Sequence, residues 1–206
     1  MQTAKSSMLS PLYYLNNFLT LLDSVECHYK DLLTPDELDL LTRFRSLTKH
    51  GQALMVRLYS RRGRLFRSDK LCYPELVDLA KLTSELERAE FIERNPALGM
   101  EDLLNLATCK EIRHWWSDRL QSSAANIHKA ALVKVLCCTA ADQYYQRVPF
   151  TVIWVQHREW TELLLLLFFG HSGQDLSTFI TAELGYAHYE NYPLASKDRL
   201  FRKRVD

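Results

Sequence analysis

Hydrophobic residues recur every three or four positions along much of the chain, which is the spacing that puts them on one face of a helix. In residues 11–30, Leu15, Phe18, Leu22 and Val25 share such a face. Comparable patterns predict further helices over residues 52–62, 74–82, 158–169 and 177–184. The hydrophobic pattern therefore predicts a mainly helical protein.

Three capping boxes mark helix starts independently of the hydrophobic pattern. In a capping box, a Ser or Thr is followed three positions later by a Glu, and each side chain binds the other residue's backbone N–H. The pairs are Thr34 with Glu37, Ser84 with Glu87, and Thr108 with Glu111. The first pair also has Pro35 at the first helical position, which proline favours. We expect helices to begin at all three sites, the second ending near Ala89.

Two short segments predict extended backbone. Residues 64–73 alternate loosely, with Leu65, Leu71 and Tyr73 apolar, and residues 91–94 precede an Asn-Pro turn. Short helices followed by a small pair of strands are typical of a winged helix-turn-helix, which offers one helix to nucleic acid. The predicted fold class is mainly α, with a winged helix-turn-helix-like unit and minor β structure.

A second compact region is predicted beyond residues 96–102. The helix opened by Thr108, a polar loop at residues 121–126 and a helix over residues 127–138 form a helix-loop-helix. Leu132, Val133 and Leu136 fall on the inner face of the last helix.

Composition indicates a globular protein with an apolar core. Of 206 residues, 47% are hydrophobic, with only 6 Gly and 6 Pro. The five cysteines have no disulfide spacing, and Cys137 adjoins Cys138, which favours free thiols in a reducing compartment. The first residues lack the form of a signal peptide, and the most apolar run, residues 163–169, is far shorter than the ~20 residues that cross a bilayer. We expect a cytoplasmic protein with no membrane partner.

Charge is unevenly distributed, although the formal net charge is only +1. Residues 51–73 hold one acid, Asp69, whereas residues 74–102 hold eight acids and three bases. A basic stretch with interleaved apolar anchors is typical of a phosphate-binding surface. The alternative is a solvated helix face whose arginines pair with the neighbouring acids. The candidate DNA-binding residues of this basic stretch are Arg57, Arg61, Arg62, Arg64, Arg67 and Lys70.

Within that stretch, two kinds of position are expected. Arg57 lies between Val56 and Leu58, so a partly buried structural role is an alternative for it. The three arginines that flank Gly63 are expected to be exposed.

The second region forms a further candidate surface, because residues 103–138 hold five bases and two acids. Its candidate DNA-binding residues are Lys110, Arg113, His114, Lys129 and Lys134. Trp115 and Trp116 could stack on bases, but their helical position favours the core.

No catalytic or metal-binding residue is predicted. Cys27 with His28, and Cys109 with His114, lack a second ligand pair at zinc spacing. The glycines match neither common phosphate-binding loop, and no nucleophile triad can be read from the sequence.

Four motifs carry a resemblance to a known family. They are YYLNNF at 13–18, YKDLL at 29–33, GQALMVRLYSRR at 51–62 and LCYPEL at 71–76. In this order and spacing they resemble the N-terminal region of the Fanconi-associated nuclease family, whose catalytic unit is a VRR-NUC domain. Residues 103–138 are similar to the family's SAP-type helix-loop-helix, although residues 121–126 have Ser and Ala where glycine is common. The similarity extends through residues 175–179 and Leu184–Gly185.

The resemblance implies a structure-specific DNA repair nuclease that binds branched or flapped DNA and cuts it with Mg or Mn. Its cutting residues belong to a C-terminal core with an acid-x-Lys triplet, in which the acid holds the metal. No Asp or Glu of this chain is followed two positions later by Lys. We therefore expect an N-terminal fragment without the catalytic domain, with no cofactor of its own and no cutting activity alone.

The expected organisation has four parts: an N-terminal helix (1–33), a winged-helix-like DNA-binding unit (34–98), a SAP-like unit (99–140) and a helical region leading toward the catalytic part (141–206). The expected function is to hold DNA by its backbone and shape. The alternative is a protein-protein interaction module of a repair factor. An intramolecular contact with the nuclease domain is a further option, and the oligomeric state stays open.

Overall fold

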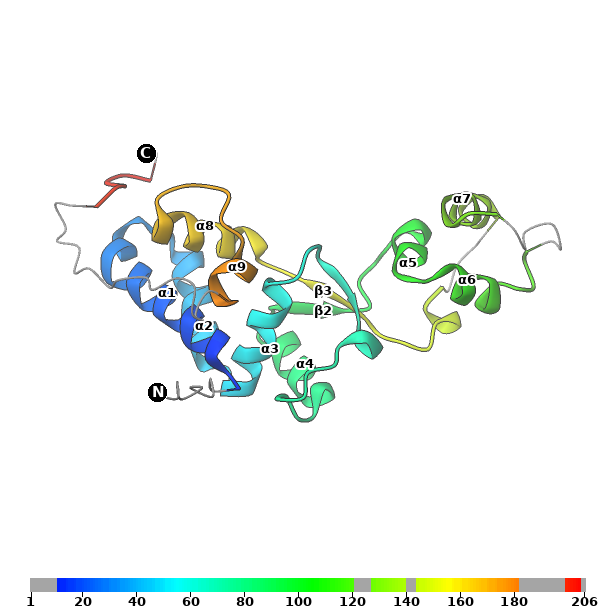
Figure 1. Cartoon of the computed structure of the whole chain (residues 1–206), viewed down its shortest axis with the longest axis horizontal. Helices are drawn as coiled ribbons and strands as arrows, with labels where there is room; N and C mark the ends of the chain where they lie inside the picture. Colours follow the sequence, from blue (N-terminus) through cyan, green and yellow to red (C-terminus); the bar gives the residue numbers. More distant parts are fainter. Residues whose placement is uncertain (1–10, 121–126, 140–143, 182–198, 205–206) are drawn as a thin grey trace, which may run out of the picture. The chain divides into compact units, whose positions relative to one another are not determined.

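The computed structural model describes residues 11–120, 127–139, 144–181 and 199–204 (Figure 1). It is mainly helical with a small three-stranded sheet, which confirms the predicted fold class. The chain divides into two compact units. Unit 1 comprises Met1–Arg62, Tyr73–Phe91 and Gln156–Asp206, and unit 2 comprises Gly63–Cys72 and Ile92–Val155. The four domain ranges named above stay a prediction.

Unit 1 is a set of helices packed through their apolar faces. In it α1 packs against α3, α8 and α9, and α3 packs against α4. Phe44 lies in the core, with ring centroids 5.2 Å from Phe18, 6.1 Å from Phe91 and 6.3 Å from Trp160. The helices are α1 (Tyr13–Tyr29), α2 (Pro35–Ser46), α3 (Lys49–Tyr59), α4 (Leu79–Arg88), α8 (Arg158–Phe169) and α9 (Leu176–Thr181).

Two of the three predicted capping boxes are present. Thr34 and Glu37 exchange side-chain bonds at the start of α2, and Thr108 and Glu111 do so at the start of α6 (Cys109–Trp115). The box at Ser84 is wrong, because α4 is one helix that begins after Asp78. Ser84 lies inside it and donates its hydroxyl to the Ala80 carbonyl 2.9 Å away, one turn earlier.

The separate helices predicted over 74–82 and 84–89 are therefore wrong as two elements. Asp78 caps α4 by accepting a bond from the Lys81 N–H at 3.1 Å. A carboxylate at this position satisfies a backbone donor that has no partner within the helix, so the helix starts there and not at Pro74.

Gly51 lies inside α3, which begins at Lys49 and not at residue 52 as predicted. Thr48 caps α3 by accepting from the Gly51 N–H at 3.1 Å. Glu85 of α4 binds both the Thr48 N–H, at 2.5 Å, and the Thr48 hydroxyl, at 2.8 Å. A Cβ on Gly51 would lie 2.8 Å from the nearer Glu85 oxygen. The glycine lets the Glu85 carboxylate reach the first turn of α3.

Unit 2 contains the sheet, in the order β1-β3-β2 with antiparallel pairing. The two strands expected from the sequence are present, but they do not pair with each other. β3 lies between them and was not predicted: Trp154 pairs with Leu65 on one side and with Glu93 on the other. A short strand is stable only when its N–H and C=O groups find partners, and β3 supplies them to both neighbours. The strands are β1 (Leu65–Arg67), β2 (Ile92–Arg94) and β3 (Val152–Val155).

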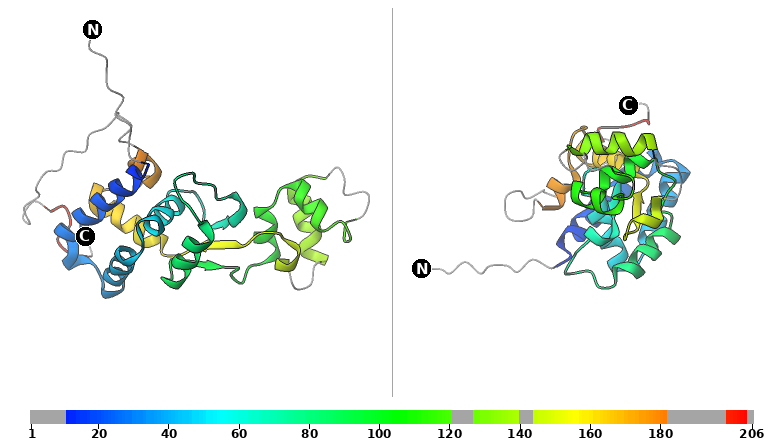
Figure 2. Two further views of the ribbon diagram at one scale, coloured as in Figure 1. Left: turned by 90° about the horizontal axis from the view of Figure 1, so that it is seen from below. Right: turned by 90° about the vertical axis from the view of Figure 1, so that its right-hand side faces the viewer.

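The helices of unit 2 surround a second apolar core. In the views of Figure 2, α5, α6 and α7 gather together, and α7 packs against both α5 and α6. Leu132, Val133 and Leu136 are buried on α7, as predicted. The predicted loop at residues 121–126 lies outside the described residues. The helices are α5 (Met100–Leu106), α6 (Cys109–Trp115) and α7 (Lys129–Thr139).

The helix predicted over residues 158–169 is confirmed as α8. The start of the helix predicted over residues 177–184 is confirmed by α9 (Leu176–Thr181). The last residues of that predicted helix lie outside the described part of the chain. Within the described segments, no helix has the length and apolar character needed to cross a membrane. The five cysteines carry no disulfide.

Candidate nucleic-acid interface

The basic residues predicted for DNA contact fall into two groups once the chain is folded: some are tied to acids inside a unit, and others are exposed. Arg57 belongs to the first group. Its Nη2 donates to the Glu75 carboxylate at 2.6 Å, and its guanidinium lies 3.9 Å from the centroid of the Tyr14 ring. The alternative from the sequence, pairing with the acids that follow the basic stretch, is realised at this residue.

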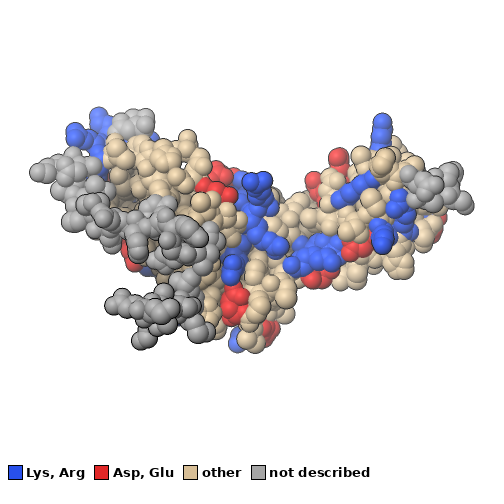
Figure 3. Space-filling model, viewed as in Figure 1, with Lys and Arg blue, Asp and Glu red and all other residues tan. Residues whose placement is uncertain are grey.

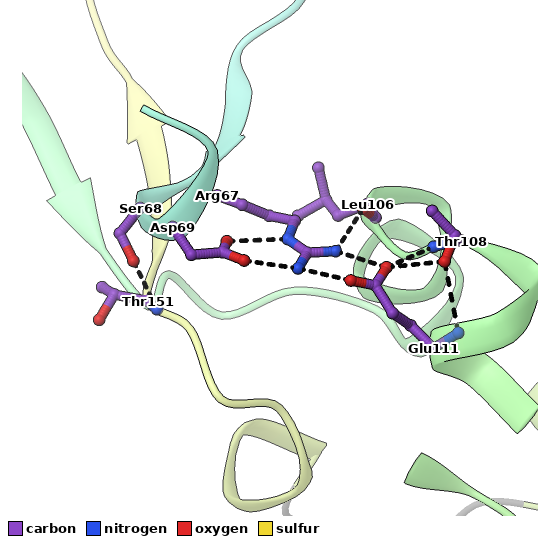
Figure 4. A network of polar contacts seen from close by, with 7 residues as sticks. All are labelled: Arg67, Ser68, Asp69, Leu106, Thr108, Glu111 and Thr151. Atoms are coloured by element: carbon purple, nitrogen blue, oxygen red, sulfur yellow. Dashed lines mark hydrogen bonds and ion pairs between the residues drawn. The ribbon is translucent and has the colours of Figure 1, made fainter. Parts of the chain in front are cut away.

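Arg67 is the most completely engaged of the predicted residues, and its side chain is only 5% exposed (Figure 4). It donates two hydrogen bonds to Asp69, at 3.0 and 2.7 Å, and two to Glu111, at 2.7 and 2.8 Å. A fifth bond, at 3.4 Å, reaches the Leu106 carbonyl. A guanidinium has five N–H donors, so all of them are used within unit 2 and none is left for a phosphate.

The electrostatics of this network favour the charged forms of its members. Hydrogen bonds from Arg67 lower the pKa of Glu111 to about 2, with a further contribution from Thr108. Hydrogen bonds from the same arginine lower the pKa of Asp69. The Arg67 guanidinium also stacks 4.0 Å from the centroid of Phe150. The network joins the end of β1 to the start of α6, so Arg67 has a structural role.

Arg61 and Arg62 are exposed just beyond the end of α3 in unit 1. Their backbone is fixed by Arg158 of α8, whose Nη2 donates to the Leu58 carbonyl at 3.0 Å and to the Arg61 carbonyl. Leu58 lies in the last turn of α3 and Arg61 just beyond it, where a cation also complements the helix dipole. Arg158 was not predicted from the sequence, where only its place at the start of an apolar helix marks it.

Arg64 and Lys70 are exposed in unit 2, on either side of the buried Arg67. The Arg64 carbonyl accepts from the Val155 N–H at 2.8 Å, so its backbone extends the β1-β3 ladder by one residue. Gly63, which precedes it, has φ +83, a left-handed conformation that favours glycine. Along the chain, this turn lies between the exposed Arg61 and Arg62 of unit 1 and the exposed Arg64 of unit 2.

The second predicted surface is divided in the same way. Lys110, His114 and Lys134 are exposed on α6 and α7. Lys129 donates to the Asn105 carbonyl at 2.7 Å, and Arg113 donates to the Ile127 carbonyl at 2.8 Å. These two side chains therefore tie α7 and the segment before it to α5 and α6.

The two adjacent tryptophans at the end of α6, Trp115 and the following Trp116, belong to the interior of unit 2. Trp116 is buried, as the core interpretation predicted, and Trp115 is half-buried with its ring centroid 5.7 Å from that of Phe150. Figure 3 shows Lys and Arg side chains gathered in surface patches, with acidic side chains beside them.

The donor sets of the described residues do not fit the divalent metal that the family resemblance implies. In that part of the chain, no group of three or more His, Cys, Asp and Glu side chains comes together in a way that could hold a metal ion. No metal-dependent step is therefore assigned to these residues.

Comparisons with known proteins cover nearly the whole chain. Residues 12–93 match a family model described as "FAN1, HTH domain". The chain is 31% identical over 201 residues to a Fanconi-associated nuclease 1 homolog of Pseudomonas aeruginosa, covering 95% of this chain and 36% of the relative. It is 28% identical over 212 residues to the homolog of Arabidopsis thaliana, covering 93% of this chain and 23% of the relative.

Solved structures agree with the sequence comparisons. A crystal structure of paFAN1 bound to 2-nucleotide 5′-flap DNA with a gap superimposes with a TM-score of 0.84 at 30% identity, over 97% of this chain and 37% of that one. A second, with a 1-nucleotide flap, has a TM-score of 0.83. The chain spans only about a third of the length of the bacterial relative. The helix-turn-helix match over residues 12–93 and the similarity along nearly all of the sequence both point to Fanconi-associated nucleases, which confirms the resemblance that the four sequence motifs carry.

Proposed function

We propose that this chain is a DNA-binding region of a structure-specific repair nuclease, and that it holds branched or flapped DNA for a nuclease domain found elsewhere in the whole protein. The relatives solved with 5′-flap DNA support this proposal. The observation that carries it is the run of three exposed arginines around Gly63, namely Arg61, Arg62 and Arg64. Cutting, with Mg or Mn at the nuclease domain, belongs to the whole protein and not to these residues.

Recognition in this proposal acts on the DNA backbone and on its shape. Guanidinium groups can grip two phosphate oxygens at once, and each neutralised phosphate releases counterions. We assign α2 and α3 to a winged-helix-like unit and α6 with α7 to a SAP-like unit. No side chain is assigned to base edges, so binding is expected to depend on structure more than on sequence.

The contact residues are the exposed ones. Arg57 and Arg67 are left out of the set, because their donors are engaged by Glu75 and by Asp69 with Glu111. Arg113 and Lys129 act mainly by positioning α7. The proposed contact set is Arg61, Arg62, Arg64, Lys70, Lys110, His114 and Lys134.

The proposal also covers the cellular location of the protein and a contact between its domains. We propose a cytoplasmic location, which the free thiols support. We also propose that this region contacts the nuclease domain within the whole protein.

The test is fluorescence anisotropy of the 206-residue chain with a labelled 5′-flap DNA at rising salt. We expect binding at low salt that weakens steadily as salt rises, and changing Arg61, Arg62 and Arg64 together to Glu should weaken binding to flaps of every sequence alike. Negligible affinity at low salt would overturn the proposal. In that case, retention of a repair protein from nuclease-treated lysate would favour the interaction-module alternative.

A further inference from the structure

A hollow of about 640 Å³ lies within unit 1, beside the exposed Arg61 and Arg62. It is bounded by the end of α3, one face of α8 and the loop that joins α8 to α9. Its volume falls in the range of about 300–1,000 Å³ that small-molecule sites occupy. Three of its features point to the chemistry of a ligand.

The first feature is a group of guanidinium side chains. Arg61, Arg62 and Arg158 all line the hollow. Asp175 of the loop also lines the hollow, and its pKa is lowered first by hydrogen bonds from Ser177 and then by the charges of Arg62 and Arg158. The positive charges of these two arginines therefore act on a group that lines the hollow, and they would attract an anionic ligand there.

The second feature is a pair of buried hydroxyl groups among the lining residues. Tyr59 is 4% exposed and Thr161 is 5% exposed. Neither hydroxyl makes a hydrogen bond of normal geometry with any residue that the structure describes, although the two interact with each other. Buried polar groups without full partners are rare and costly, so a ligand that accepts or donates here would be stabilised.

The third feature is the mixture of apolar and acidic groups in the remaining wall. Leu165, Leu166 and Leu176 supply apolar surface, and Glu162 adds an exposed carboxylate. A bare inorganic anion would gain nothing from the leucines and would be repelled by the acids. A ligand with an anionic end, an apolar ring and N–H donors on that ring would match all three features.

We propose that this hollow binds a single nucleotide, with its phosphate on Arg61 and Arg62, its base against the leucines of α8, and polar edges of the base near Glu162. The proposal rests on the proposed function, because the nucleotide would be an unpaired one of the bound DNA. It extends that function, because it adds a pocket for one nucleotide of the bound DNA strand to a surface that otherwise contacts phosphates.

The test titrates the whole 206-residue chain with deoxyadenosine 5′-monophosphate and follows backbone amides by NMR. The amides of Gly170 and Gly173 lie in the loop that borders the hollow and report on its occupancy. We expect saturable shifts at these amides, and binding about tenfold weaker for deoxyadenosine, which lacks the phosphate.

Two variants separate the pocket from general charge effects. Arg62→Gln should weaken nucleotide binding about tenfold, whereas Lys81→Gln, at an exposed position on α4 of the same unit, should leave it unchanged. Thr161→Val keeps the shape of the side chain and removes the hydroxyl, so it should weaken binding without disturbing the circular dichroism spectrum.

The outcomes distinguish this proposal from the proposed function. No amide shift at saturating nucleotide, or equal loss in Arg62→Gln and Lys81→Gln, would overturn the pocket even if flap DNA binds. Nucleotide binding at Gly170 and Gly173 without any binding of flap DNA would uphold the pocket and overturn the DNA-holding function.

Discussion

The Arg67 guanidinium and the Glu111 carboxylate face each other in a fork, through two hydrogen bonds of 2.7 and 2.8 Å. The residues are 44 positions apart, and the pair joins β1 to α6 inside unit 2. Glu111 also closes the capping box of α6 by accepting from the Thr108 N–H. One carboxylate therefore starts a helix and anchors it to the sheet, so the pair is a structural feature of unit 2.

Replacing Arg67 with Lys tests this assignment. An ammonium group has three donors on a flexible stem and cannot reproduce the five bonds of the guanidinium. We expect Arg67→Lys to lower the free energy of unfolding by about 2–3 kcal/mol, measured by urea denaturation. Lys70→Gln, at an exposed neighbouring position, should change it by less than about 0.5 kcal/mol. Wild-type stability of Arg67→Lys combined with weaker DNA binding would return this residue to the contact surface.

Acid should weaken the same network. The pKa of Glu111 is about 2 in the folded chain, below the ordinary value of about 4.3, because Arg67 binds the charged form. Its stabilisation is therefore fully present above about pH 4.3 and is lost as the pH falls toward 2. We expect the gap in melting temperature between wild type and Glu111→Gln to be widest near pH 6 and to close between about pH 4 and 2. A gap that stays constant over this range would contradict the assignment.

The close approach of Gly51 and Glu85 gives a double-mutant prediction. Alanine has a helix propensity about 1 kcal/mol better than glycine, but a Cβ at position 51 would meet the Glu85 carboxylate and displace it from Thr48. We expect Gly51→Ala to bring no gain in wild type and to stabilise the Glu85→Ala variant by about 0.5–1 kcal/mol. Thermal unfolding of the four proteins measures the coupling. An equal gain in both backgrounds would show that the two residues do not compete.

The division of the basic stretch into structural and exposed arginines predicts different salt dependence. Each phosphate contact adds about 0.9 to the slope of log K against log salt for duplex DNA. Changing Arg61, Arg62 and Arg64 together to Gln should reduce that slope by about 2–3. Arg57→Gln should leave the slope unchanged and instead lower stability, because it removes the bonds to Glu75. A reduced slope for Arg57→Gln would mean that its guanidinium reaches DNA.

Features that depend on neighbouring residues in the chain could be predicted well. The capping boxes at Thr34 and Thr108, and the bounds of α8, follow from a few side chains within one or two turns. The same local signal failed at Ser84, because a better cap at Asp78 lies upstream and the hydroxyl could bond within the helix instead. Local patterns therefore predict which segments are helical. Where each helix starts depends on which of several nearby residues caps it.

The candidate interface was predictable in part. The sequence separates Arg57, which lies between two apolar residues, from the arginines that flank Gly63, but it does not distinguish Arg67 from those exposed arginines. Their roles differ because Glu75 and Glu111 reach two of them from distant positions.

By itself the sequence determined the helical class, the positions of the basic stretches and the resemblance that the comparisons support, because periodicity, charge and motifs are local properties of the chain. Only the tertiary structure decided that β3 lies between β1 and β2, and that Arg67 is buried among acids. The physical reason is that strand partners and ion pairs are chosen by contacts between residues far apart in the chain, which no local pattern records.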